Sequence, residues 1–211
     1  MSNREHFDHW AEEYNDDIDI SIQTRGFPFE GYYSVLEHVQ DLVLEKHVTE
    51  VNILDLGVGT GLLSEKLYQK GIKIHGIDFS PKMLKQAKQK MPKGRFFLHD
   101  FSHGMPKELA DTKFDFIISS YALHHLPDNE KYKLLAELTN YLKFDGKIIV
   151  ADISFKTKKD LADCRKEFEK EWDEEEYYLI GEEFVQNLEE KGFKAIYQQI
   201  SPCAGVLTIE K

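Results

Sequence analysis

The sequence predicts an α/β fold in which helices cover both faces of a largely parallel sheet. Three observations support this prediction. Beyond residue 50, apolar runs of β-type composition alternate with stretches of helical period. A turn containing three glycines follows the first of these runs. Near the carboxyl end, two further runs are joined only by residues 201–205, a link too short for a crossover helix.

Five apolar runs are predicted to form the parallel part of the sheet. Each is short, and each is followed by turn residues or by the start of a helical stretch. The predicted strands are Val51–Leu56, Lys73–Asp78, Arg95–Asp100, Phe114–Ser119 and Lys147–Asp152. Because longer helical stretches separate most of them, their connections are crossovers and the strands should run parallel.

Spacing and capping residues predict the helices between these strands. Apolar residues from Leu62 onward recur at helical spacing directly after the glycine turn. Ser80 is a favourable N-cap, and Pro81 suits the first helical position. Asp128 is expected to cap another helix. Its apolar stripe comprises Leu134, Leu135, Leu138, Tyr141 and Leu142.

The carboxyl-terminal part departs from the alternating pattern. The short link at 201–205 predicts a hairpin between 193–200 and 206–209, so the last strand should be antiparallel and the sheet mixed. Ahead of this hairpin, residues 157–191 are predicted to be a helical insertion. Its apolar stripe comprises Leu161, Cys164, Phe168 and Trp172.

Length and composition favour one globular domain. The chain has 211 residues, of which 41% are hydrophobic, and a core of this size needs no metal or disulfide for stability. The net charge of −11 disfavours nucleic acid and anionic lipid as partners. No apolar run is long enough to span a bilayer, and the amino terminus is not signal-like, so we expect a cytoplasmic protein with two reduced cysteines, Cys164 and Cys203.

The glycine turn Gly57, Gly59 and Gly61 lies where open α/β sheets bind ligands. Dinucleotides and S-adenosylmethionine both use such a turn. The dinucleotide fingerprint requires a glycine three positions after Gly59, at position 62, where this sequence has Leu. Asp55 would also repel a pyrophosphate, by about 3 kcal/mol at ~5 Å and an effective dielectric constant of about 20. Asp55 therefore favours a cation, such as the methionyl ammonium of S-adenosylmethionine.

Acids at the ends of the next two strands extend this candidate site. Asp78 is placed to accept hydrogen bonds from both ribose hydroxyls. Asp100 could accept from the adenine amino group while the main chain at Phe101 contacts the ring. Phe79 and Met83, together with Ile77, could form an apolar wall for adenine.

These motifs resemble those of class I S-adenosylmethionine-dependent methyltransferases. The resemblance is strong from Asn52 to Val150, and residues 7–16 are similar to the entry segment of small uncharacterised Gram-positive methyltransferases of the YrrT type. The resemblance implies a Rossmann-like, seven-stranded mixed sheet whose last strand is antiparallel. It also implies S-adenosylmethionine as cofactor and S-adenosylhomocysteine as product.

The same resemblance suggests how the site is covered. Residues 1–45 are expected to form an amino-terminal helical lid, with Tyr14 near the cofactor. Trp10, Tyr32 and Tyr33 could also close over the sulfonium, whose charge favours aromatic faces, and Arg25 could pair with a carboxylate of the cofactor or substrate. An amphipathic helix packed on the sheet is the alternative. Residues 155–191 are expected to shape the acceptor pocket, and their acidic run 167–176 is interpreted mainly as a solvated face.

Methyl transfer requires in-line positioning of donor and acceptor more than it requires a reactive side chain. His124 and His125, just after the fourth strand, are the candidates for a general base. The main chain around Ser119, Ser120 and Tyr121 is expected to contact the cofactor. No metal site is predicted, because the adjacent histidines lack i, i+4 spacing and no Cys/His cluster accompanies them.

The leading hypothesis is an enzyme that methylates a small molecule. A protein that binds S-adenosylmethionine without turnover shares every cofactor residue, so only turnover separates the two. A nicotinamide oxidoreductase is a third interpretation, favoured only if NAD rather than S-adenosylhomocysteine stabilises the protein. The fourth strand lacks the Asn-Pro-Pro-Tyr signature of amide and base N-methyltransferases, which argues against DNA adenine and glutamine as targets. The acceptor atom and the oligomeric state stay open.

Overall fold

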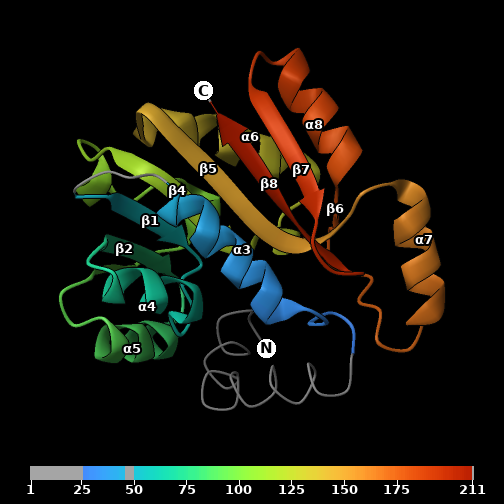
Figure 1. Ribbon diagram of the computed structural model, residues 1–211, viewed down its shortest axis with the longest axis horizontal. Coiled ribbons are helices and arrows are strands. Elements are labelled where there is room, and N and C mark those ends of the chain that lie inside the picture. The colour runs from blue at the N-terminus through green and yellow to red at the C-terminus, as the bar shows by residue number, and fades with distance from the viewer. Residues whose placement is uncertain (1–25, 46–49, 211) are drawn as a thin grey trace.

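The computed structural model describes residues 26–45 and 50–210, and these form a sheet with helices on both of its faces (Figure 1). The strand order is β3-β2-β1-β4-β5-β8-β7, and the short strand β6 pairs with β5 off this path. The strands are β1 (Asn52–Leu56), β2 (Lys73–Asp78), β3 (Arg95–Leu98), β4 (Phe114–Ser120), β5 (Leu142–Phe155), β6 (Leu179–Ile180), β7 (Lys194–Gln199) and β8 (Ala204–Glu210).

Strand direction matches the predicted mixed sheet. Strands β1 to β5 pair in parallel, whereas β8 is antiparallel to both β5 and β7. The hairpin link spans 200–203 and places β8 between β5 and β7. The Rossmann-like class, with seven strands on the main path and an antiparallel last strand, is therefore confirmed.

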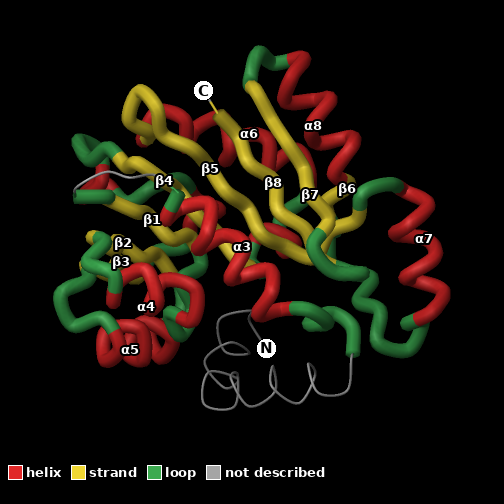
Figure 2. The backbone as a smooth tube through the Cα atoms, viewed as in Figure 1, coloured by secondary structure: helices red, strands yellow, loops and turns green. Residues whose placement is uncertain are grey.

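Alternating strand residues build one core on each face of the sheet. Figure 2 shows the helices that cover these faces. Ile53 and Phe116 face a core shared with α3 (Tyr32–Leu44), α4 (Leu62–Gln69), α5 (Pro81–Lys90) and α7 (Lys158–Glu167). Leu54 and Ile117 face the other core, which includes residues of α6 (Asp128–Leu138) and α8 (Gly181–Glu190). This alternation is the period-two pattern of strands buried on both faces.

The strand order reverses between β1 and β4, which makes this the switch point of the sheet. In open α/β sheets the crevice outside the carboxyl ends of the strands at such a point binds ligands. The glycine turn follows β1, and a single-turn helix, η3 (Leu123–His125), follows β4 after only two residues. The fold thus brings the two most informative motifs of the sequence to one edge.

Two local predictions need correction. Asp128 is the first residue of α6 rather than its cap, which is Pro127, and its carboxylate instead accepts a hydrogen bond from Lys131 at 2.9 Å. The predicted helical stripe from Leu161 to Trp172 is interrupted, because α7 ends at Glu167 and α8 begins only at Gly181. Phe168 and Trp172 lie in the connection, where their rings stack on Phe27.

Helix α7 starts at a complete capping box. The Thr157 hydroxyl accepts from the Asp160 amide at 3.2 Å, and the Asp160 carboxylate accepts from the Thr157 amide at 3.0 Å. The cap therefore fixes the start of a helix whose buried side joins the core.

Cys164 on this helix and Cys203 in the hairpin link are both free and buried.

The described amino-terminal part comprises residues 26–31 and the helix α3. This helix packs on the sheet in front of β1 and β5 (Figure 1). Its buried side chains include Val35 and Val39, and Gln40 donates to the Leu63 carbonyl at 3.1 Å. The predictions for Trp10, Tyr14 and Arg25 fall outside the described residues. No helix among residues 26–45 and 50–210 is long and apolar enough to cross a membrane.

Replacing Thr157 with alanine should lower the free energy of unfolding by about 1 kcal/mol, because the amide of Asp160 loses its hydroxyl acceptor. Thr157→Ser keeps that acceptor and should remain close to the parent protein. Chemical denaturation followed by circular dichroism measures both variants. Equal losses in the two variants would contradict a capping role.

Candidate functional site

The glycine turn adopts a backbone that side chains rarely allow. Gly57, Gly59 and Gly61 all have positive φ, at 70°, 53° and 86°. A Cβ atom on Gly57 would lie 2.6 Å from the Cβ of Ala122, which follows β4. Glycine at 57 therefore permits both the turn and the close approach of the two loops at the switch point.

Asp55 is a buried carboxylate directly before this turn, with a relative exposure of 1%. One oxygen accepts a hydrogen bond from the Ser64 hydroxyl at 2.5 Å, and the other has no partner among the described residues. Burial raises the pKa of Asp55 to about 7; the hydrogen bond from Ser64 opposes this shift, and the nearby Asp78 adds to it. A buried acceptor of this kind favours a cationic or hydrogen-bond-donating ligand.

Asp78 ends β2 next to the turn and organises the loop. Its two oxygens accept from the amides of Gly59 and Ser80, each at 2.8 Å. The Ser80 hydroxyl in turn accepts from the Met83 amide at 3.2 Å, which confirms the predicted cap and proline start of α5. One carboxylate thus ties the glycine turn to the start of the next helix.

The predicted adenine contacts lie at the ends of β2 and β3. Met83 and Phe101 are buried, and Phe79 is half-buried. The Asp100 carboxylate is partly exposed and caps the short helix η1 (Phe101–His103) by accepting from the Ser102 amide at 2.9 Å. Phe101 also lies against the turn, because a Cβ on Gly57 would be 3.7 Å from its ring.

The end of β4 completes the predicted cofactor side of the site. The Ser119 hydroxyl donates to the Leu56 carbonyl at 2.8 Å and so ties β4 to β1. Tyr121 has a φ of 49°, which is unusual for a residue other than glycine. Its ring contacts those of Tyr32, at 4.7 Å between centroids, and Phe29, at 5.7 Å.

Backbone strain of this kind is common where a chain is shaped around a ligand. Here it falls between the buried Ser119 and the histidines of η3. Of the two described lid candidates, Tyr32 is buried against Tyr121, whereas Tyr33 is exposed. Tyr32 is therefore the candidate that the fold brings to the edge of the site.

His124 is held by an acid that the sequence analysis did not assign to the site. Its Nδ1 lies 2.6 Å from Asp152 Oδ1, and Asp152 Oδ2 accepts from the amides of Leu123 and His124. Burial alone would lower the pKa of His124, but the charge and hydrogen bond of Asp152 outweigh it, so this pKa is raised. The same pairing outweighs burial for Asp152 and lowers its pKa.

Glu176 and Lys131 also join this group. Glu176 Oε1 lies 3.5 Å from Nε2 of His124 and 3.9 Å from Nδ1 of His125. It is therefore not part of a solvated face, although the other acids of the run, such as Glu174 and Glu175, are exposed. Lys131 is almost fully buried and donates to Asp128 and to the Tyr177 carbonyl. The one signal for Asp152 was its place at a strand end; nothing in sequence spacing marked Glu176 or Lys131.

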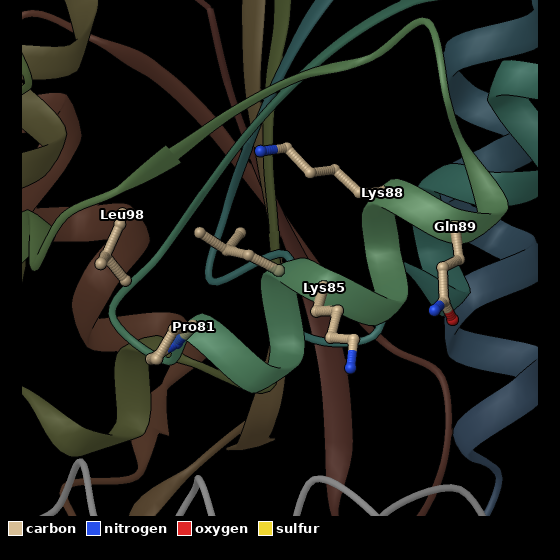
Figure 3. A pocket seen from close by; sticks show the side chains of 6 residues that line it. Pro81, Lys85, Lys88, Gln89 and Leu98 are labelled. Atoms are coloured by element: carbon tan, nitrogen blue, oxygen red, sulfur yellow. The ribbon is translucent and has the colours of Figure 1, made fainter.

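A separate groove of about 520 Å³ lies between α5 and β3, and Figure 3 shows five of its residues labelled. Pro81, Leu84 and Leu98 form its apolar part, with Lys85 and Lys88 beside them. The stretch 79–99 contains basic residues but no acid, in contrast to the negative net charge of the whole chain. None of the predicted cofactor or catalytic residues lines this groove.

The described residues of the predicted site therefore gather at one edge of the sheet, around the ends of β1 to β4. Those on the cofactor side are Asp55, Gly57, Gly59, Gly61, Asp78, Phe79, Met83, Asp100, Phe101, Ser119 and Tyr121. His124 and His125 lie at the same edge, after β4. This edge therefore combines a glycine turn whose main chain a ligand can approach, a buried carboxylate, and a charged cluster that could contact a second ligand.

Comparison with known proteins identifies the family. Residues 53–146 match the model of a methyltransferase domain. A methyltransferase of Alkaliphilus oremlandii is 35% identical over 151 residues, covering 72% of this chain and 67% of the relative. A methyltransferase of Geobacillus kaustophilus is 32% identical over 203 residues, covering 92% of this chain and 89% of the relative.

Solved structures show the same fold. The DhpI complex with S-adenosylhomocysteine has a TM-score of 0.70 at 16% identity, covering 99% of this chain and 94% of that one. Magnesium protoporphyrin IX methyltransferase from Synechocystis PCC 6803, with bound S-adenosylhomocysteine, has a TM-score of 0.68 at 22% identity, covering 85% and 82%. With the fold, the glycine turn and these sequence relatives in agreement, the chain belongs to the class I S-adenosylmethionine-dependent methyltransferases.

Proposed function

We propose that this enzyme binds S-adenosylmethionine in the crevice at the β1/β4 switch point and transfers its methyl group to a small molecule, mainly by positioning the two reactants. The observation that carries the proposal is the glycine turn flanked by two buried carboxylates, Asp55 and Asp78. The structural relatives bound to S-adenosylhomocysteine support the cofactor.

Asp55 fits the cationic end of this cofactor. Its second oxygen is buried and has no partner among the described residues, so it can accept from an ammonium group directly or through a water molecule. Binding a cation would also stabilise the ionised form of a carboxyl whose pKa burial has raised. Gly59 leaves room for the ligand beside the main chain, since a Cβ atom there would meet nothing closer than 4.0 Å.

The acids of the next two strands suit the nucleoside. Asp78 lies beside the glycine turn, where it accepts from two amides, and a carboxylate oxygen can accept from more than one donor, which suits a ribose hydroxyl. Asp100 and Phe101 are proposed to meet adenine, with Phe79 and Met83 on its apolar side. The main chain at Ser119 and Tyr121 is proposed to lie along the cofactor.

When bound, S-adenosylmethionine supplies a methyl group that is already activated by the positive sulfur. The protein's own contribution is then to hold the acceptor in line, which can lower the barrier by about 7–11 kcal/mol when the geometry is right. No covalent bond to a side chain is needed. The roles proposed for this chain are binding, orientation and exclusion of water.

His124 and His125 are proposed to meet the acceptor. Both lie in η3, directly after the β4 segment assigned to the cofactor. His124 is buried and oriented by Asp152, whereas His125 is half-buried and so is the more accessible ring. The general base predicted from the sequence would act here if the acceptor carries a proton.

The surrounding segments are proposed to enclose the site. Residues 155–191 pack Trp172 and Tyr178 against Phe27, which joins the segment after α7 to the start of the described chain. Tyr177 donates its amide to the His124 carbonyl at 2.8 Å. The insertion therefore forms a wall beside η3. Residues 1–45, including Tyr14, are proposed to cover the site as a lid.

Asp78→Ala should weaken binding of S-adenosylhomocysteine by ~1.5–3 kcal/mol, about 10- to 150-fold, because charged hydrogen bonds are lost. Isothermal titration calorimetry measures this affinity. Asp163→Ala, which removes an exposed carboxylate on α7, is the matched control. The Gly59 and Ser80 amides also lose their acceptor, so a parallel unfolding curve must show that the variant is folded. An unchanged affinity would remove Asp78 from the site.

Affinity for S-adenosylhomocysteine should fall as pH decreases below about 7. The pKa of Asp55 is raised to about 7, so below that pH its carboxyl is neutral and a proton must be lost for it to pair with the ligand's ammonium group. The decline approaches about tenfold per pH unit and is absent in Asp55→Asn. Calorimetry at pH 6 and pH 8 checks both proteins; equal wild-type affinities would refute the role of Asp55.

The raised pKa of Asp55 also affects the ligand-free protein. A carboxyl with a raised folded pKa contributes stability that is present below its unfolded value of 3.8 and is lost as pH rises through about 7. Ligand binding should offset this loss. S-adenosylhomocysteine should therefore raise the melting temperature more at pH 8 than at pH 6 at the same concentration.

Turnover is tested by incubating the protein with S-adenosylmethionine and a panel of small O, N and S nucleophiles. Formation of S-adenosylhomocysteine that depends on one acceptor class supports the proposal. His125→Ala should reduce that rate more than it reduces cofactor affinity. Acceptor-dependent turnover only with RNA or protein would overturn the small-molecule assignment. Tight cofactor binding without turnover in any panel would instead favour a binding protein.

A further inference from the structure

Three potential metal ligands meet where η3 approaches the segment before β6. His124, His125 and Glu176 each offer one ligand atom, and these atoms all lie within 4.8 Å of one another. The two separations to Glu176 Oε1 are 3.5 Å from His124 Nε2 and 3.9 Å from His125 Nδ1. Tetrahedral zinc with bonds of about 2.0–2.2 Å places its ligand atoms about 3.3–3.6 Å apart, so the separation of His124 from Glu176 already suits the ion, whereas His125 would move closer on binding. We propose that this His-His-Glu cluster binds a divalent transition-metal ion of the zinc class.

The position of Asp152 supports this proposal, because metal-binding histidines usually bond a carboxylate through their other nitrogen. Asp152 Oδ1 lies 2.6 Å from His124 Nδ1, which leaves Nε2 directed to Glu176. Asp152 is itself fixed by three amides, those of Leu123, His124 and Ile153. The ring of His124 is therefore oriented before any ion binds.

The local charge also favours a dication. When ionised, Asp152 and Glu176 carry two negative charges beside His124, and the positive charge of Lys131 is balanced by its own partner, Asp128. Lys131 is directed to Asp128 and to the Tyr177 carbonyl. Asp152 and Glu176 are 3% and 19% exposed, so solvent screens these two carboxylates little and a divalent ion would balance their charge.

The cluster has the chemistry of an open site rather than of a closed structural one. Two histidines and one carboxylate are a ligand set found in catalytic zinc sites, whose fourth position is held by water or substrate. His125 and Glu176 retain side-chain exposures of 32% and 19%, so an ion can reach them from solvent. If the fourth coordination position holds a methyl acceptor, that role rests on the proposed function. The binding of the ion itself does not depend on it.

The test is titration of the chelator-treated full-length protein with zinc chloride, followed by calorimetry, and with cobalt chloride, followed by visible absorption. We expect a single zinc equivalent and the intense absorption of four- or five-coordinate cobalt. Glu176→Gln and His125→Ala should each weaken zinc binding at least about tenfold, and Asp152→Asn about 10- to 100-fold. Glu175→Gln, an exposed neighbour in the same run, is the matched control and should leave zinc binding unchanged.

Two further controls keep the result interpretable. The double variant Cys164→Ser/Cys203→Ser removes both thiols and should retain the zinc site. His124→Ala removes the partner of a buried carboxylate and could unfold the protein, so the half-exposed Glu176 and His125 provide the decisive variants. Zinc bound equally by Glu176→Gln and by the parent, or lost with the thiols, would overturn the proposal, as would the absence of stoichiometric binding.

Failure of this proposal is distinguishable from failure of the proposed function. Metal-free protein should still bind S-adenosylhomocysteine, because none of the three ligands belongs to the proposed cofactor set. Loss of zinc binding with intact cofactor binding would therefore reject the metal site alone. Zinc binding without cofactor binding would reject the methyltransferase site and leave the metal site standing.

Discussion

The burial of carboxylates at the carboxyl ends of parallel strands is the constraint on which the rest of the site depends. Asp55, Asp78 and Asp152 are each less than a tenth exposed, although a buried carboxylate is unfavourable unless it is paired. Each is stabilised in a different way: a hydroxyl beside Asp55, loop amides beside Asp78, and a histidine beside Asp152. These bonds fix the glycine turn, the start of α5 and the position of η3.

The three carboxylates divide the edge of the sheet between two kinds of chemistry. Asp55 and Asp78 flank a turn with three glycines, which suits a nucleoside with a cationic tail. Asp152 instead holds His124 in a cluster rich in charge, completed by Glu176 from a distant segment. The residues Tyr121 and Ala122 lie between them, so a ligand on one side would meet a ligand on the other across a short stretch of strained chain.

The sheet itself could be predicted because its signals are local. Five apolar runs, the Ser80–Pro81 helix start and a hairpin link too short for a crossover are features of neighbouring residues. They predicted the seven strands of the main path and their directions, but not the two-residue strand β6. The errors also arose from local signals. Aspartate is common at helix caps, but Asp128 is the first residue of the helix itself. The apolar residues from Leu161 to Trp172 have helical spacing, but α7 ends at Glu167.

The sequence by itself determined the fold class, the glycine turn and the acids at the strand ends, because the alternation of strands and helices and the chemistry of turns depend on residues close together along the chain. Only the tertiary structure decided what those acids contact. Asp152 is 28 residues from His124, and Lys131 is 46 residues from Tyr177, so no periodicity relates them. Their contacts arise because β4 pairs with β5 and the insertion packs beside them at one edge of the sheet. The same packing brings Glu176, predicted to be solvated, next to His124 and His125.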